Sequence, residues 1–197
     1  ARRHRTTVVT PDIDEEAAER HGYFRHPNLT YRRMAPSRPR LWVFSDQYLR
    51  KFFVRSYDHL VNTRFAFYRP RNFTERFLGA VGAMLPAGFF TPARATRLEA
   101  MLARPSKAFL ELVREVRPKL MVTPTPGYQY LPLVAEAVVF AARLGLPTVA
   151  VNCSFDNPYT QPKFLRKTDY IFVWNDRMAR EVGELHGYAP ERISVVG

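Results

Sequence analysis

Short apolar runs alternate with amphipathic stretches in the second half of the chain. Apolar residues recur with helical spacing over 109–116, and the apolar run 120–122 follows directly and predicts a strand. The same order then repeats, with predicted helices over 131–144 and 176–186 and predicted strands over 148–151, 170–173 and 193–196. Short apolar strands that alternate with helices are typical of a mostly parallel sheet buried on both faces. The pattern therefore predicts an α/β fold.

The first half of the chain is less regular. Residues 6–10 and 29–34 predict strands, and the acidic stretch 12–20 between them predicts a helix or an ordered loop. Apolar residues over 41–52 follow helical spacing and leave basic residues on other faces, which predicts an amphipathic helix. Residues 79–92 carry three Gly, two Pro and no charge, which predicts a buried or membrane-facing turn between helical pieces.

The positive charge of the chain is concentrated in one segment. The formal net charge is +12, and residues 25–107 hold 16 Lys and Arg against 4 acidic residues, while the rest of the chain balances at 14 of each. Aromatic residues are interleaved with the basic ones in this segment. Such a surface favours an anionic partner, which is a nucleic acid, phospholipid head groups or a phosphorylated substrate.

Composition narrows the class of protein. No run of the 197 residues reaches the roughly 18 uncharged apolar residues of a membrane-spanning helix. The single cysteine, Cys153, cannot form an internal disulfide, which favours a reducing, cytoplasmic setting. Neither a P-loop nor a dinucleotide-binding glycine pattern is present, and the scattered His residues form no zinc set, so we expect no cofactor and no metal.

Ligands of parallel sheets bind in the loops that follow the carboxyl ends of the strands. This rule selects three loops, 123–130, 152–163 and 174–176, of which the middle one is richest in polar side chains. Asp156 and Asn157 in that loop are candidates for catalysis, although Asx side chains also shape turns. The candidate substrate-binding residues are Ser154, Lys163, Tyr128, Gln129 and Asn175.

Several of these residues have a structural alternative. Lys163 suits a solvated loop cation as well as a group that stabilises a phosphate, and Asn175 suits a helix cap. We expect Trp174 in the core and His186 as a helix-end residue. Ser154 has no His partner at motif distance, which argues against a nucleophilic serine.

Residues 117–197 resemble the N-terminal domain of nucleotide-sugar-dependent glycosyltransferases with the B-type, two-Rossmann-domain fold, especially those of surface-polysaccharide synthesis. The resemblance rests on Gly-Leu-Pro-Thr at 145–148, Ser-Phe-Asp-Asn at 154–157, Lys163, Asp-Tyr-Ile-Phe-Val-Trp-Asn at 169–175, Leu-His-Gly at 185–187 and Arg-Ile-Ser-Val-Val-Gly at 192–197. Phe155 stands where the family commonly has Trp.

The resemblance implies one Rossmann-like N-terminal domain over 1–197, truncated at both ends, with a basic, aromatic, helical insertion at about 35–107. The donor nucleotide sugar would then bind mainly to a C-terminal domain beyond Gly197, so we expect the chain alone to be inactive. The acceptor would be lipid-linked or a polysaccharide, with Asp156 as the general base and Lys163 beside the leaving phosphate.

Two other functions remain open from the sequence. A related enzyme would transfer glycerol phosphate during polymer synthesis. A non-catalytic basic module would bind an anionic membrane or nucleic acid through residues 25–107. Nucleic acid ranks last, because no recognised binding signature accompanies the charge. We expect a cytoplasmic protein that is peripheral on the inner membrane face.

Overall fold

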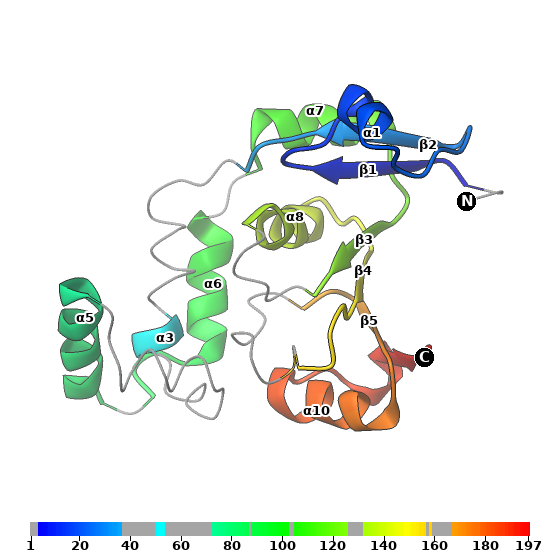
Figure 1. The fold of residues 1–197 in the computed structure, drawn as a ribbon. Coiled ribbons are helices and arrows are strands. Elements are labelled where there is room, and N and C mark those ends of the chain that lie inside the picture. The colour runs from blue at the N-terminus through cyan, green and yellow to red at the C-terminus, as the bar shows by residue number, and fades with distance from the viewer. Residues whose placement is uncertain are drawn as a thin grey trace. The chain divides into compact units, whose positions relative to one another are not determined.

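The computed structural model describes two compact units of the chain (Figure 1). The first unit comprises Ala1–Ser37 with Pro105–Pro118, and the second comprises Arg38–Arg104 with Lys119–Gly197. The residues that the structure describes are 4–36, 50–53, 72–86, 88–102, 105–125, 132–156, 158 and 167–197.

The first unit contains a pair of parallel strands and two helices. Strands β1 (Thr6–Thr10) and β2 (Leu29–Arg33) pair from Thr6↔Leu29 to Thr10↔Arg33, which confirms both predicted strands. Helix α1 (Glu15–Arg20) begins after Asp14, whose side chain caps it by accepting a hydrogen bond from the Ala17 amide at 2.9 Å. Helix α7 (Lys107–Val116) confirms the predicted helix over 109–116 and begins at the Ser106 cap.

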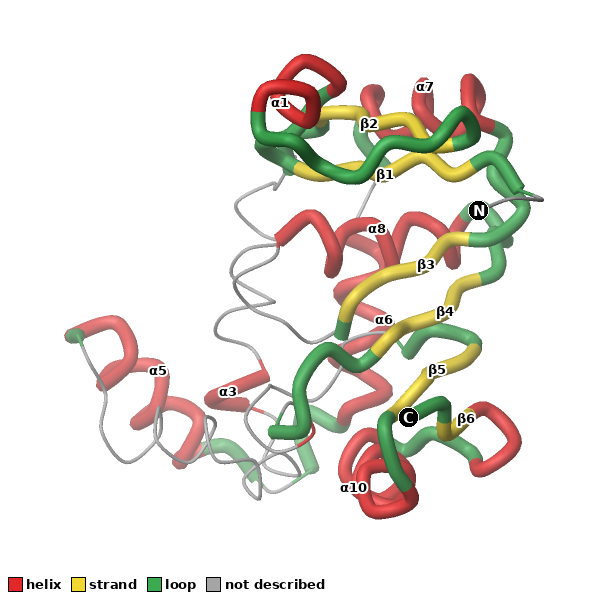
Figure 2. Tube along the Cα trace, turned by 45° about the vertical axis from the view of Figure 1, so that its right-hand side comes forward, coloured by secondary structure: helices red, strands yellow, loops and turns green. Residues whose placement is uncertain are grey.

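The second unit is built on a four-stranded parallel sheet in the order β3-β4-β5-β6 (Figure 2). The strands are β3 (Met121–Pro124), β4 (Thr148–Val151), β5 (Tyr170–Val173) and β6 (Ile193–Val195), and a 3₁₀ turn, η3 (Pro190–Arg192), leads into β6. Helix α8 (Pro132–Arg143) packs against β3 and β4, and α10 (Asp176–His186) packs against β5 and β6. The chain is therefore α/β, with parallel sheets flanked by helices, and is compatible with a Rossmann-like fold.

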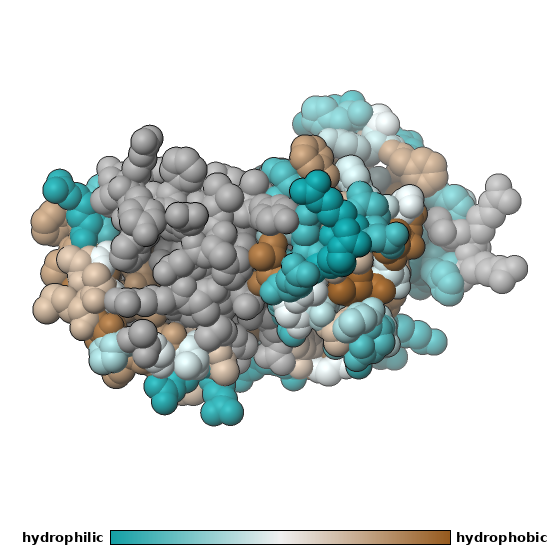
Figure 3. All heavy atoms as spheres, turned by 90° about the horizontal axis from the view of Figure 1, so that it is seen from below, coloured by the Kyte–Doolittle hydropathy of each residue, from teal (hydrophilic) through white to brown (hydrophobic). Residues whose placement is uncertain are grey.

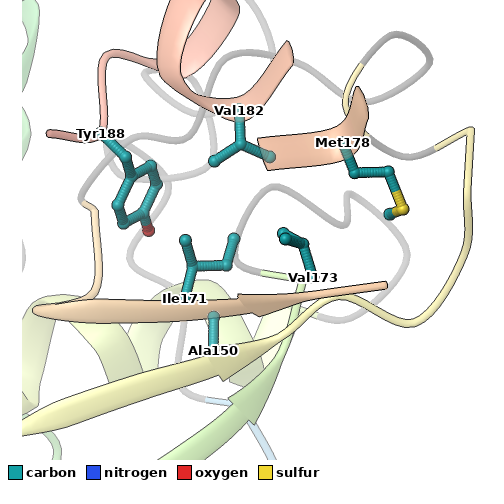
Figure 4. Close-up of a cluster of buried hydrophobic side chains, with 6 residues drawn as sticks. All are labelled: Ala150, Ile171, Val173, Met178, Val182 and Tyr188. Atoms are coloured by element: carbon teal, nitrogen blue, oxygen red, sulfur yellow. The ribbon is translucent and has the colours of Figure 1, made fainter. Parts of the chain in front are cut away.

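The apolar core of the second unit lies between β5 and α10. Ala150, Ile171 and Val173 of the sheet meet Met178 and Val182 of the helix, and Tyr188 closes one end (Figure 4). Side chains alternate along a strand, so the chain neighbours of these core residues point the other way. On that face Val149 is buried but Val122, Val151 and Tyr170 are exposed, so the expected burial of both sheet faces is wrong for these three residues. The described helices of the second unit leave these three side chains open to solvent.

Three more helices complete the described part of the second unit: α3 (Arg50–Phe53), α5 (Phe73–Met84) and α6 (Pro92–Leu102). Helix α5 corrects the turn predicted over 79–92, since it continues through Gly79 and Gly82 as far as Met84. The reason is close packing, because a Cβ at Gly82 would lie 2.0 Å from the Phe52 carbonyl oxygen. This glycine lets two helices approach, and the chain turns only later, at Gly88, whose φ of +90° few other residues adopt.

Most of the predicted insertion at about 35–107 belongs to the second unit, and much of it lies outside the described residues. The predicted amphipathic helix over 41–52 is described only from residue 50 onward, in α3. The single-domain organisation stays a prediction. Among the described helices, none has both the length and the apolar character needed to cross a bilayer.

Candidate functional site

The polar residues that follow the carboxyl ends of β3 and β4 form a buried hydrogen-bonded pair. Thr125 and Asn152 are each 1% exposed, and the Thr125 hydroxyl donates to the Asn152 side-chain oxygen at 2.8 Å. The Asn152 amide donates to the Phe172 carbonyl of β5 at 2.9 Å. The pair therefore joins three adjacent strands at the edge where parallel sheets bind ligands.

This pair holds the start of the loop that follows β4. The Cys153 amide donates to the Thr125 hydroxyl at 3.2 Å, and the Asn152 side-chain amide donates to the Ser154 carbonyl at 3.1 Å. The Ser154 hydroxyl in turn donates to Asp156 Oδ1. Asp156 is half-buried, and its carboxylate is oriented by a chain of hydrogen bonds that begins in the sheet. A carboxylate held in this way can accept a proton from a bound hydroxyl group.

Trp174, the first residue after β5, belongs to the same cluster. Its indole Nε1 donates to the Asn152 carbonyl at 2.8 Å, yet the side chain is 44% exposed. The expectation that Trp174 lies in the core is therefore wrong. The reason is its place beyond the last core residue of the strand, Val173, where the ring is tethered by its polar edge and not enclosed.

Asn175 caps α10, because its side-chain oxygen accepts a hydrogen bond from the Met178 amide at 2.9 Å. The cap alternative for Asn175 is thus confirmed, and its role in substrate binding stays a prediction. Of the other candidates, Asn157, Lys163, Tyr128 and Gln129 lie outside the described residues. The structure therefore brings together Ser154 and Asp156 among the predicted catalytic and binding residues.

His186, the last residue of α10, is 2% exposed and supports the same loop from the other side. Its Nε2 donates to the carbonyl oxygen of Pro158 at 2.8 Å, since a carbonyl can only accept. Its position at a helix end agrees with the sequence analysis, but its burial was not foreseen. Pro158 is itself fully buried, so α10 holds the loop at a second point beyond Asp156.

Thr148 and Asp169 form hydrogen bonds with each other at the amino ends of β4 and β5. The Thr148 amide and hydroxyl both donate to Asp169 Oδ2, at 2.8 and 2.9 Å, and the Asp169 amide donates back to the Thr148 hydroxyl. Thr148 and Asp169 belong to the motifs that carry the family resemblance. Because they lie at the amino ends of β4 and β5, away from the ligand-binding edge, their role is structural.

Tyr188 fixes the segment after α10. Its hydroxyl accepts a hydrogen bond from the Thr168 amide at 3.0 Å and contacts the Thr168 hydroxyl at 2.9 Å. Burial raises the pKa of Tyr188 from 10.0 to about 12, although the hydrogen bonds from Thr168 act in the opposite direction. Desolvation of the phenolate therefore outweighs those hydrogen bonds.

Sequence reasoning selected the loops that follow β3 and β4 but did not single out Thr125 and Asn152 within them. A signal existed, because Asn152 is the first residue after β4 and Thr125 the first after β3, in two loops chosen for their position. In the part of the chain that the structure describes, no three His, Cys, Asp or Glu residues are grouped so that they could hold a metal ion. A scan against protein-family models, a search of curated proteins and a search of solved structures each found no match.

Proposed function

We propose that this chain is the acceptor-binding half of a nucleotide-sugar-dependent glycosyltransferase with two Rossmann-like domains, acting in surface-polysaccharide synthesis at the cytoplasmic face of a membrane. The observation that carries the proposal is the Asp156 carboxylate, which accepts a hydrogen bond from the Ser154 hydroxyl in a loop that Asn152 holds at the carboxyl ends of parallel strands. Ligands of α/β sheets bind at that edge. The motif resemblance over 117–197 supports the same class of enzyme.

The proposed chemistry begins with an acceptor hydroxyl beside Asp156. As the hydroxyl oxygen attacks the anomeric carbon of the donor, its proton passes to the carboxylate, and the bond from that carbon to the nucleotide phosphate breaks. Ser154 holds one carboxylate oxygen in place through its hydroxyl, which fixes the direction from which the proton arrives. Asn157 would orient a neighbouring hydroxyl group through its amide.

Trp174 gives the proposed site an apolar surface. The exposed indole face is held by the hydrogen bond from Nε1 to Asn152, so it is already ordered before a ligand binds. The C–H groups on one face of a pyranose ring suit such a surface, while the hydroxyl groups at its rim suit Asp156. Tyr128 and Gln129, from the loop after β3, would contact further acceptor hydroxyl groups.

The donor side of the reaction requires groups beyond this cluster. A departing nucleotide phosphate needs positive charge or amide donors close by, and Lys163 is the proposed cation. The remaining donor contacts belong to the second Rossmann-like domain that the proposal requires, so the 197-residue chain alone should not turn over a nucleotide sugar.

The test is a transfer assay with a protein that carries both domains. Radiolabelled nucleotide sugars and, separately, a labelled nucleotide-activated glycerol phosphate are incubated with extracted lipid-linked acceptors, and the products are separated. Transfer of a sugar is expected. Transfer of glycerol phosphate alone would identify the protein as a polymer synthase in place of the proposed enzyme. If neither donor is transferred to an acceptor, the proposal is contradicted.

The same assay with Trp174→Phe and Trp174→Ala tests the proposed sugar surface. Phe retains an aromatic face and should keep most of the activity, whereas Ala should raise the KM for the acceptor with a smaller effect on kcat. An unchanged KM in Trp174→Ala would remove Trp174 from the site and leave the assignment of Asp156 untouched.

A further inference from the structure

Helix α5 directs three of its large apolar side chains outward. Phe73 is 81% exposed, Phe77 is 58% exposed and Met84 is 84% exposed. These residues, with Ala80, are spaced by four, three and four positions, which places them on one face of the helix. The rings of Phe73 and Phe77 are stacked with their centroids 6.5 Å apart. We call these four residues the apolar stripe of α5.

The opposite face of α5 is already used for packing. Glu75, Leu78 and Gly82 are its buried residues, and a side chain at Gly82 would collide with the backbone of Phe52 in α3. Helix α5 lies beside α3 (Figure 1). The helix is therefore fixed in place by one face and presents the apolar stripe with the other. Figure 3 shows mainly tan and brown atoms at the left end, where α5 lies, and a larger share of teal atoms over α10.

The apolar stripe lies within the basic segment of the sequence, and one basic residue of α5 lies beside it. Residues 25–107 hold 16 Lys and Arg against 4 acidic residues. Arg76 lies next to the stripe on α5 and is exposed. Exposed Phe and Met on one helix face, with an arginine beside them, are typical of helices that lie in the interface of an anionic bilayer.

We propose that the apolar stripe of α5 inserts into the surface of an anionic lipid bilayer. Phe73, Phe77 and Met84 enter the boundary between head groups and acyl chains, while Arg76 beside them binds a lipid phosphate. Nucleic acid fits less well, because phosphate contacts use the charge but leave an outward apolar helix face without a partner. This proposal is independent of the proposed transferase activity.

The experiment is co-sedimentation of the 197-residue chain with sucrose-loaded vesicles of phosphatidylcholine, with and without phosphatidylglycerol. Binding to the anionic vesicles is expected, with a decrease as salt rises. The double variant Phe73→Ser with Phe77→Ser should bind these vesicles at least about 10-fold more weakly, because binding scales with the apolar area buried. Arg76→Glu should weaken binding to the anionic vesicles, and the remaining binding should depend less on salt concentration.

The matched control is the double variant Leu144→Ser with Val196→Ser, which removes two exposed aliphatic side chains from other elements and should bind like the unmodified chain. Circular dichroism of each variant verifies the fold. The proposal is overturned by equal binding to neutral and anionic vesicles, or by equal binding of the two double variants. It is also overturned if the chain binds a single-stranded oligonucleotide but does not bind phosphatidylglycerol vesicles. A third contradicting result is that substitution of the stripe residues changes only the self-association of the chain, measured by sedimentation, and not its binding to vesicles.

A fluorescent label on an introduced cysteine reports directly which helix face enters the bilayer. Cys153→Ser removes the single native thiol, and an environment-sensitive nitrobenzoxadiazole label is attached at Phe77→Cys or, as the control, at Arg180→Cys on α10. Emission should rise on addition of anionic vesicles only for the label at position 77. A rise at position 180, or no rise at either position, would contradict insertion of the stripe.

Discussion

Helices α5 and α10 of the second unit begin with the same kind of cap but differ in whether they bury or expose their large apolar side chains. Each is preceded by an asparagine whose side-chain oxygen accepts a hydrogen bond at 2.9 Å from the amide three residues on, in Asn72–Glu75 and in Asn175–Met178. Helix α10 buries Met178 and Val182 and covers its outer face with charged residues, whereas α5 exposes its largest side chains.

The comparison shows that the interactions that form a helix differ from those that decide which of its faces is buried. Caps and apolar spacing act locally and explain where both helices begin. The orientation of α5 follows from its contact with α3, where Gly82 permits an approach that a phenylalanine face would prevent. A face of exposed Phe and Met on a helix packed by its other side indicates an interaction surface, while α10 serves the core and the loop of Asp156.

The largest effect that distinguishes the two helices is on stability. Met178→Ala removes a side chain that is 2% exposed and should lower the free energy of unfolding by about 2–5 kcal/mol, because a cavity remains in the core. Phe77→Ala deletes a larger but exposed side chain and should change it by no more than about 0.5 kcal/mol. Urea unfolding of both variants measures the two values. A similar decrease in the free energy of unfolding for both variants would show that Phe77 is buried in solution, and the contrast between α5 and α10 would then be wrong.

A smaller effect concerns pH on the α10 side. Because the pKa of Tyr188 is raised from 10.0 to about 12 in the folded state, its contribution to stability is fully present below pH 10 and is lost as the pH rises toward 12. The expected loss is about 2–3 kcal/mol, measured by urea unfolding across that range. The variant Tyr188→Phe has no phenol to ionise and should lose less over the same range, although it starts less stable. A parallel decline in the two proteins would assign the loss to other groups.

The smallest effect should be the same in both helices. Asn72→Ala and Asn175→Ala each remove a cap and should each cost about 1 kcal/mol of stability. Asn72→Ser and Asn175→Ser retain a capping oxygen and serve as controls. If only Asn175→Ala lowers the urea midpoint, α5 does not unfold with the sheet, and the two helices differ in coupling as well as in orientation.

Local signals in the sequence predicted most of the described elements of the fold. The helix over 176–186 was predicted with its observed bounds, since Asn175 caps it and Gly187, with a φ of +71°, ends it. The turn predicted over 79–92 was placed too early, because a glycine that admits a neighbouring backbone has the same local pattern as a glycine in a turn. Exposure of Val122 and Tyr170 also depends on what covers the sheet, which strand patterns do not specify.

The candidate site was predictable as loops but not as contacts. The rule for parallel sheets selected the segment that contains Asp156. The pairing of Thr125 with Asn152 spans 27 positions and depends on strand register, which periodicity leaves undetermined. The burial of His186 likewise depends on where the loop at Pro158 returns to α10. Long-range partners of this kind required the structure.

Replacement of Asp156 by asparagine in a protein with both domains is the most direct test of the central claim. Asparagine retains the volume and an oxygen that can accept from Ser154, but it cannot take up the proton of the acceptor. The account predicts that kcat falls by about 10²–10⁴-fold while the melting temperature stays nearly unchanged. Transfer that survives in Asp156→Asn, together with a melting temperature that falls by several degrees, would show that Asp156 shapes the loop and is not the base.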